Sequence, residues 1–261
     1  MLQDLKTRVA RHISRWKYAP DIKVERSSDL LRLGSEYGGW TFEPSADLHG
    51  AVIVSCGFGE DASFDTEFAS RFHAKVIVVD PTPRAIRHFN AIQQHLGQPS
   101  SQPYVKGGLQ PVASYDLREI TSDSLILEPS ALWVENTTVK FFEPPDPRHV
   151  SHSIVNFQSN YNPNGSHIEV PAITLETLIA KYRLGILPLM KIDIEGAEIS
   201  VIQYMLAKSL IVRQLLVEFD EMLCPSDRSR KEIEETDKKL RQAGYICRHF
   251  DGPANFLYVQ Q

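Results

Sequence analysis

From residue 51 onward, the chain alternates short runs rich in β-branched residues with longer segments of helical periodicity. The runs AVIVSC, KVIVVD, LPLMKIDI and QLLVEF are typical of strands, and apolar residues recur every three or four positions in the segments between them. Strands joined by crossover helices build a parallel sheet with helices on both faces. The alternation therefore predicts an α/β fold with a doubly wound, mostly parallel, Rossmann-like sheet.

Two later segments depart from this alternation. YICRHF and NFLYVQ flank a turn at Asp251 and are expected to form an antiparallel hairpin at the edge of the sheet. Between about residues 109 and 170 the chain is rich in Pro, Ser and Asn, which is typical of an insertion that is either functional or disordered. We therefore expect one main domain over residues 46–261, with an insertion at about 109–170.

Residues 1–45 are expected to form an extension of that domain. Residues 1–17 place apolar side chains at helical spacing, with Lys and Arg on the other positions. This basic amphipathic helix is expected to pack on the domain, with weak contact to a membrane surface as the alternative. In SEYGGWTF, residues 35–42, paired glycines interrupt regular structure and aromatic side chains need a surface, so we expect a flap.

Composition excludes several classes of protein. A net charge of −5 and a pI near 6.0 argue against nucleic-acid binding through a general basic field. The three cysteines, Cys56, Cys224 and Cys247, lie far apart and predict neither a disulfide framework nor a zinc site. No run of eighteen apolar residues and no signal peptide are present, so we expect a cytoplasmic protein without a transmembrane segment. Nothing in the sequence sets the oligomeric state.

A glycine-containing turn follows the first strand of the alternation, in CGFGEDASFD. Gly57 and Gly59 permit a tight turn that lets a ligand approach the backbone at the start of the next helix. With Ala62 they satisfy G-x-G-x-x-A, and Asp80 ends the second strand, where a carboxylate grips ribose hydroxyls. These residues predict a nucleotide site, and a nicotinamide dinucleotide is one candidate.

Two acids beside that turn separate the candidate nucleotides. Glu60 and Asp61 stand where the pyrophosphate of a dinucleotide would use the positive end of the helix, and they would repel it. A ligand that joins adenosine to a cationic, amino-bearing tail would be attracted instead, and S-adenosylmethionine is such a ligand. The alternative for both residues is that they are first-turn acids that stabilise the helix and contact no ligand.

The segment KIDIEGAE carries charge where an interior strand is expected to be apolar. Lys191, Asp193 and Glu195 alternate onto one side of the strand. Buried charges must be paired or must face an opening, and open α/β sheets have their opening beyond the carboxyl ends of the strands. We therefore expect Asp193 and Glu195 at that opening, beside the glycine turn, with Lys191 deeper. An internal ion pair between Lys191 and Asp193, with Glu195 and Glu198 as helix caps, is the structural alternative.

The next strand predicts a further carboxylate at the same edge. Glu218 ends QLLVEF, and Asp220 and Glu221 behind it are expected to be solvated. Carboxylates at adjacent strand ends suit hard divalent cations, so a metal ion between Asp193 and Glu218 is left open.

The run LPLMKIDIEGAEISVI, preceded by ITLETLIAKY and followed by LLVEF, resembles the signature of the FkbM family of S-adenosylmethionine-dependent methyltransferases. VSCGFGEDASFD and VIVVDPTP resemble its donor-binding turn and second-strand end, and YGGW and PRHVSHS resemble a subset of the family. The resemblance spans about residues 35–220. It implies a class I methyltransferase fold over residues 46–261 and, for many members, methylation of a hydroxyl on a sugar, a glycoconjugate or a polyketide-type product.

This reading gives the candidate residues their roles. The cofactor, S-adenosyl-L-methionine, is expected to contact Gly57 and Gly59 in the turn, Glu60 or Asp61 at its amino acid end, Asp80 at the ribose, and Pro81 and Thr82 beside the adenine. The acceptor is expected to be a small molecule or a glycan. Because an alcohol is a weak nucleophile, a base is needed. Asp193 is the first candidate, then Glu195, with Lys191 beside them and His149 or His152 as alternatives.

Two other functions fit the same sheet. One is an NAD(P)-dependent oxidoreductase, and the other is a non-catalytic nucleotide-binding module. The segment around residues 109–135 and the N-terminal helix lie outside the family pattern and leave the acceptor open.

Overall fold

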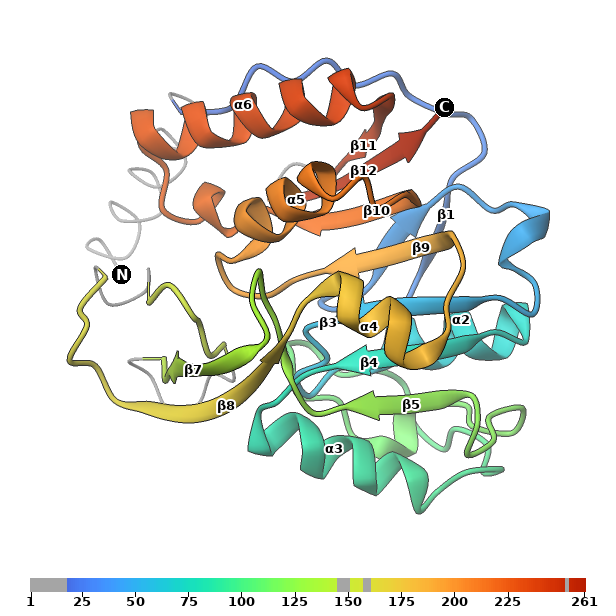
Figure 1. Cartoon of the computed structure of the whole chain (residues 1–261). Helices are drawn as coiled ribbons and strands as arrows, with labels where there is room; N and C mark the ends of the chain where they lie inside the picture. Colours follow the sequence, from blue (N-terminus) through green and yellow to red (C-terminus); the bar gives the residue numbers. More distant parts are fainter. Residues whose placement is uncertain (1–17, 145–150, 157–160, 252–253) are drawn as a thin grey trace, which may run out of the picture.

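The computed structural model describes residues 18–144, 151–156, 161–251 and 254–261 (Figure 1). The predicted helix over residues 1–17 and the candidate His149 lie outside these ranges. Within them, no helix is long and apolar enough to cross a membrane, and the three cysteines form no disulfide.

A seven-stranded sheet forms the centre of the molecule, in the order β11-β12-β10-β9-β3-β4-β5. Its strands are β3 (Val52–Cys56), β4 (Lys75–Val79), β5 (Leu125–Glu128), β9 (Leu187–Ile192), β10 (Val212–Glu218), β11 (Tyr245–Phe250) and β12 (Asn255–Gln260). The five strands from β10 to β5 are parallel, and β12 runs antiparallel to both β10 and β11. This confirms the mostly parallel sheet with an antiparallel C-terminal hairpin. The order and directions are those of a class I methyltransferase fold.

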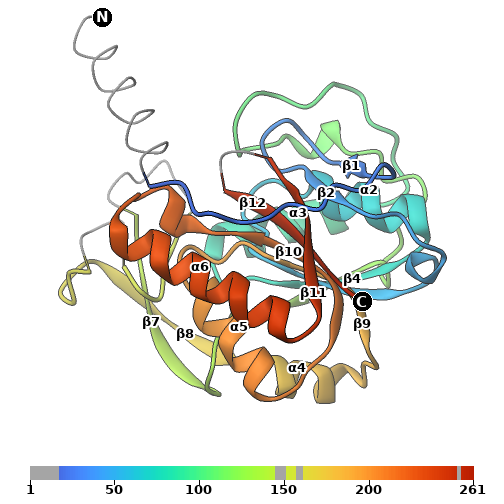
Figure 2. The same ribbon diagram turned by 90° about the horizontal axis from the view of Figure 1, so that it is seen from above.

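Helices cover both faces of the sheet because its strands are apolar on both sides. Val54 and Cys56 face one hydrophobic core, which includes side chains of α4, α5 and α6, while Ile53 faces a second core with α2 and α3. Figure 2 shows α4, α5 and α6 together along one side of the sheet. The helices are α2 (Ser63–Phe72), α3 (Pro83–Gln93), α4 (Leu175–Tyr182), α5 (Glu198–Ala207) and α6 (Asp227–Gln242), with short 3-10 turns η1 (Ala46–Leu48), η2 (Val112–Ser114) and η4 (Asp220–Met222).

The segment at about 109–170, predicted as an insertion, contains one strand of the central sheet. β5 lies at the sheet edge and pairs with β4 in parallel. It is only four residues long and no helix directly follows it, so the pattern of alternation gave no sign of it. The chain then forms a small sheet of β6 (Ala131–Leu132), β7 (Thr137–Phe142) and β8 (His167–Ile173). In Figure 1, β7 and β8 project on the side toward which the parallel strands point.

The predicted flap is an antiparallel hairpin of β1 (Leu31–Leu33) and β2 (Trp40–Phe42). Its connection packs tightly at the two glycines of YGGW. A Cβ on Gly38 would lie 2.6 Å from Cγ of the Asp61 side chain, and one on Gly39 would lie 2.5 Å from the carbonyl oxygen of Ser35 within the same connection. Gly38 therefore lets the flap lie against Asp61 in the turn that follows β3.

Candidate active site

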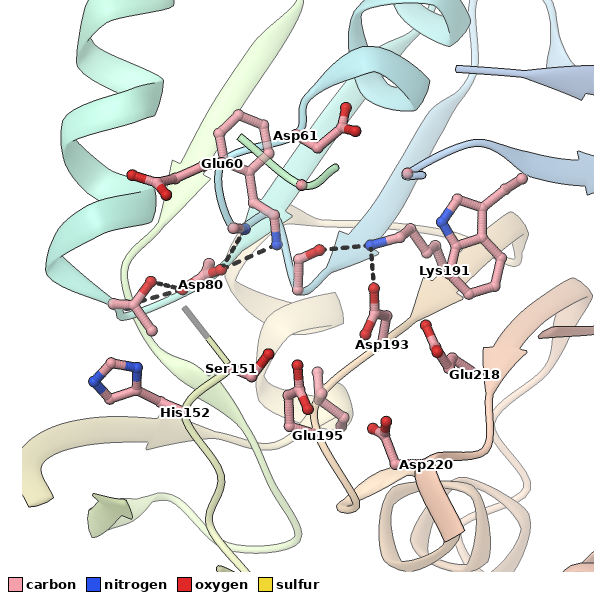
Figure 3. A pocket seen from close by; sticks show the side chains of 18 of the residues that line it. Glu60, Asp61, Asp80, Ser151, His152, Lys191, Asp193, Glu195, Glu218 and Asp220 are labelled. Atoms are coloured by element: carbon pink, nitrogen blue, oxygen red, sulfur yellow. Dashed lines mark hydrogen bonds and ion pairs between the residues drawn. The ribbon is translucent and has the colours of Figure 1, made fainter. Parts of the chain in front are cut away.

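One cavity of about 700 Å³ lies at the carboxyl ends of the parallel strands. This is where ligands bind in open α/β sheets. All eleven candidate residues that the structure describes line it (Figure 3), namely Gly57, Gly59, Glu60, Asp61, Asp80, Pro81, Thr82, His152, Lys191, Asp193 and Glu195. Segments far apart in the sequence therefore meet in one site, as the strand order requires.

Gly57 is the point of contact between the glycine turn after β3 and the segment that follows β9. Its φ of +80° belongs to the left-handed region, and a Cβ at this position would lie 1.7 Å from the carbonyl oxygen of Asp193. No side chain can be accommodated at that distance. The adjacent strands are tied further by the Asp193 N–H, which donates to the carbonyl of Cys56 at 3.2 Å. The glycine therefore lets β3 and the end of β9 approach as closely as the site requires.

Asp80 organises the turn as well as lining the cavity. Its Oδ2 accepts hydrogen bonds from the N–H groups of Phe58 (3.0 Å) and Gly59 (2.9 Å). Its Oδ1 accepts from the N–H (2.8 Å) and the hydroxyl (2.7 Å) of Thr82, which caps α3. Four donors on one carboxylate fill its usual capacity. Asp80 is thus already engaged at the position where a ribose grip was expected.

Two N–H groups at the start of α2 also have partners within the protein. The Ala62 N–H donates to the hydroxyl of Tyr115 at 3.0 Å, and the Ser63 N–H donates to Oδ1 of Asp61 at 3.0 Å. Oδ2 of Asp61 accepts from the Ser35 hydroxyl of the flap at 2.6 Å, and Glu60 pairs with Arg84 of α3. A pyrophosphate would need these N–H groups, so the turn is not built for one.

Lys191 lies buried between the glycine turn after β3 and Asp193 after β9. Its Nζ donates to the carbonyls of Gly57 (2.5 Å) and Cys56 (3.2 Å) and lies 3.6 Å from Oδ2 of Asp193. The ring of Trp40 lies 5.3 Å from the same ammonium. Burial disfavours the charge, but the carboxylates of Asp193 and Asp65 raise the pKa of Lys191 above its ordinary value. The side chain is therefore a charged tie between β9 and the glycine turn.

Asp193 and Glu195 follow β9 at the floor of the cavity. Burial raises the pKa of Asp193, and the ammonium of Lys191 opposes that rise. The Asp193 side chain remains 29% exposed, so a ligand can reach it. Glu195 has a φ of +58°, an uncommon backbone conformation for a residue with a side chain. Its carbonyl accepts a hydrogen bond from the Ser153 hydroxyl at 2.6 Å, which ties the segment after β7 to this loop.

Three more acids crowd the same edge of the sheet. Burial and the charges of Asp193 and Glu195 raise the pKa of Glu218 to about 8. Asp220 and Glu221 were expected to be solvated; this was wrong for Asp220, and Glu221 is half-buried, with its Oε2 buried. Asp220 is 2% exposed, and burial raises the pKa of Glu221 to about 7. The cause is η4, which turns the chain back beneath the edge directly after β10.

Glu198 has a structural place at the start of α5. It is fully buried, and its Oε1 accepts a hydrogen bond from the Ile194 N–H at 2.6 Å. It thus fixes the loop that carries Asp193 and Glu195, but no side-chain hydrogen bond caps the start of α5, so this contact is not the helix cap of the structural alternative. Burial and the neighbouring charge of Glu221 raise its pKa well above the ordinary value.

His152 also lines the cavity, but on its other side. In Figure 3 it lies toward Asp80, with Ser151 and Glu195 drawn between it and Asp193. Its ring stacks on Phe141 of β7, with centroids 5.8 Å apart. Among the described residues, no group of three or more His, Cys, Asp or Glu side chains is arranged to hold a metal ion.

A family model described as "Methyltransferase FkbM domain" matches residues 50–247. The chain belongs to the FkbM methyltransferase family. The match includes the glycine turn, Asp80 and the acids after β9 and β10, but it begins after the flap. The cavity of this FkbM domain is thus closed in part by residues outside the matched region, including Tyr37 and Trp40.

No curated protein matches the chain significantly. Among solved structures, a match is the fibrillarin pre-rRNA processing protein of Methanococcus jannaschii. It is 8% identical, with a TM-score of 0.40, over 92% of this chain and 86% of that chain.

Several residues of the FkbM site were not selected from the sequence. Asp220 was assigned to solvent because acids after a strand are usually exposed. Trp40 and Tyr37 belonged to a predicted flap, but nothing in the sequence placed that flap over Lys191. Ser153 ends the motif PRHVSHS, but the sequence gave this serine no role.

Proposed function

We propose that the protein is an S-adenosylmethionine-dependent methyltransferase that methylates a hydroxyl group of a small molecule or glycan, such as a sugar, a glycoconjugate or a polyketide-type product. In this proposal residues 46–261 form the methyltransferase domain and residues 1–45 carry the flap. Of the segment at about 109–170, β5 belongs to the central sheet and the small sheet of β6, β7 and β8 lies on the acceptor side. Membership of the FkbM family supports methyl transfer. The observation that carries the choice of cofactor is the glycine turn, where the N–H groups of Gly57, Phe58 and Gly59 already donate to acceptors within the protein.

Occupied N–H groups favour a cationic nucleotide over a dinucleotide. In the turn and first residues of α2, the N–H groups of Phe58, Gly59, Ala62 and Ser63 have protein partners. A diphosphate at this point would have to displace these partners and would meet Glu60 and Asp61. A sulfonium and an ammonium would be attracted to the same acids. This supports S-adenosylmethionine and disfavours the NAD(P)-dependent alternative.

The residues present fit such a cofactor. A cavity of about 700 Å³ has room for a nucleotide together with a small acceptor. Pro81 and Thr82 line the side where an adenine would lie, next to Asp80. Asp80 would hold the turn in shape. It would also accept hydrogen bonds from the ribose hydroxyls in place of those that it accepts from Thr82. When bound, the cofactor supplies a methyl group that is already electrophilic.

Asp193 is the residue that we propose takes the proton of the acceptor hydroxyl. It is reachable from the cavity, and its raised pKa makes it a better base than an ordinary carboxylate. Lys191 holds it in place from below. Glu195 would orient the acceptor. His152, on the Asp80 side, is better placed to line the cofactor end than to act as the base.

Ligand binding and turnover test the proposal together. S-adenosylhomocysteine should raise the melting temperature by mass action, whereas NADH and NADPH should not. Asp193→Asn should keep the affinity for S-adenosylhomocysteine within about threefold, roughly 0.7 kcal/mol, and abolish transfer of a labelled methyl group to hydroxyl acceptors. A shift with NADPH alone would refute the choice of cofactor. Loss of cofactor affinity with normal turnover in Asp193→Asn would refute the assigned role.

A further inference from the structure

The cavity is lined by more acidic side chains than cationic ones. Two cationic side chains from the described Lys and Arg residues line the cavity, against nine acids: Glu36, Glu60, Asp61, Asp80, Asp193, Glu195, Glu218, Asp220 and Asp251. Both cations are committed to backbone carbonyls, because Lys191 donates to Cys56 and Gly57 and Arg32 donates to Ser35 and Glu36. Four of the nine acids, Asp193, Glu195, Glu218 and Asp220, lie at or directly after the ends of β9 and β10.

Asp220 is the residue at this edge that points to a ligand. It is 2% exposed, yet it lines the cavity. Its Oδ2 is buried without a hydrogen-bond partner among the described residues. A buried carboxylate oxygen without a donor is costly. In Figure 3 the carboxylates of Asp193, Glu195, Glu218 and Asp220 turn toward a common space.

We propose that Glu218 and Asp220, next to Asp193, form a subsite for an ammonium group of the acceptor, so that the acceptor is an amino-substituted hydroxyl compound such as an amino sugar. The inference rests on the function proposed above and names its acceptor class. The ammonium would be held by the acids while a neighbouring hydroxyl faces Asp193.

Hydrogen-bond chemistry favours an ammonium over a neutral polyhydroxyl group. A sugar hydroxyl both donates and accepts, whereas an ammonium presents three donors and no acceptor. Ionised carboxylates only accept, and the cations nearby are already engaged. An ammonium also relieves the mutual repulsion of the acids, which a hydroxyl cannot do. A divalent ion is the other way to relieve it, but the described acids include no three that are arranged to hold one.

Calorimetry on protein saturated with S-adenosylhomocysteine tests this. Amino sugars that differ in the position of the amine are titrated, each against its N-acetyl derivative and its neutral hydroxyl parent. At least one amino sugar should bind about tenfold or more tightly than both neutral counterparts, a difference of roughly 1.4 kcal/mol. Burial raises the pKa of Glu218 to about 8, so this side chain holds a proton near pH 7. Binding of the amino sugar should release that proton, and the measured heat of binding should then depend on the ionisation enthalpy of the buffer.

Two conservative variants and one control complete the experiment. Asp220→Asn and Glu218→Gln should each remove the preference for the amine while leaving S-adenosylhomocysteine affinity within about threefold. Asp123→Asn, an exposed acid on the loop before β5, should keep the preference.

Three results would overturn the inference. The first is that amine and neutral sugars bind equally or not at all, and the second is tight binding of Mg²⁺ that Asp220→Asn abolishes. The third is loss of S-adenosylhomocysteine binding in both variants, which would show that these acids bind the cofactor. Failure of the unaltered protein to bind S-adenosylhomocysteine would instead defeat the proposed function itself.

Discussion

The two halves of the cavity are built from opposite kinds of polar structure. Around the glycine turn, carboxylates meet donors within the protein, as Asp80 does with four of them. At the ends of β9 and β10, Glu218 and Asp220 face other acids, and Asp220 keeps a buried oxygen without a partner among the described residues. The turn is therefore pre-shaped before any ligand arrives, whereas the acidic edge keeps a buried acceptor that, in our proposal, a ligand satisfies.

The largest effect is expected from a substitution at Gly57, the contact that joins the glycine turn to the segment after β9. Gly57→Ala places a methyl group 1.7 Å from the carbonyl oxygen of Asp193 and forces alanine into a φ of +80°. We expect loss of cooperative folding, measured by thermal melting followed by circular dichroism. Gly185→Ala is the matched control, since its Cβ would meet nothing within 4 Å. Unchanged melting of Gly57→Ala would mean that the halves are less closely joined than described.

The second prediction removes the charge that lies between the halves. Lys191→Met leaves the buried acids Asp193 and Asp65 without their counter-charge, and we expect the free energy of unfolding to fall by about 3 kcal/mol. Urea denaturation measures this loss. Lys208→Met removes a 47% exposed lysine and should cost less than about 0.5 kcal/mol. Equal losses in both variants would show that Lys191 is not a structural tie.

The third prediction concerns the pre-shaped half. Asp80→Ala removes the acceptor for the Phe58, Gly59 and Thr82 donors and frees the turn. S-adenosylhomocysteine should then bind about tenfold or more weakly, because hydrogen bonds to a charged group contribute about 1.5–3 kcal/mol. Isothermal calorimetry provides the measurement, with Asp116→Ala, an exposed acid paired to Arg118, as control. Unaltered affinity would assign Asp80 to structure alone.

Per pH unit, the smallest effect is expected at the acidic edge. Since burial and neighbouring acids raise the pKa of Glu218 to about 8 in the folded state, the folded state holds more protons than the unfolded state above pH 4.5. Stability should therefore fall as pH rises from about 4.5 to about 8, by no more than about 1.4 kcal/mol per pH unit for one group. Glu218→Gln should flatten this dependence in melting curves. An unchanged slope would contradict the crowding described here.

Strand content and sheet direction were predictable from the sequence, because buried parallel strands are apolar on both faces and β3, β4, β9 and β10 each satisfied that pattern. β5 did not, since it is short and lies at an edge. Gly57, Asp80 and Asp193 were predictable for the same reason: each follows a recognisable strand, and the carboxyl ends of parallel strands meet.

The remainder of the site depends on contacts between segments far apart in the chain. Lys191 was expected to neutralise acids, but its bonds to the carbonyls of Cys56 and Gly57 depend on the register between β3 and β9. The burial of Asp220 depends on how η4 folds after β10. Neither arrangement can be predicted from the local sequence. The pattern therefore placed Lys191 in the right region of the site but placed Asp220 in solvent.

The position of β12 between β10 and β11 has a consequence for how the chain folds. β10 gains its second neighbour only after the β11–β12 hairpin has formed and docked, so until then one edge of β10 offers unpaired backbone groups. Glu218 pairs across this late junction with Asn255. Refolding should therefore restore α2 and the turn after β3 before the acidic edge exists, and slippage or aggregation should begin at β10.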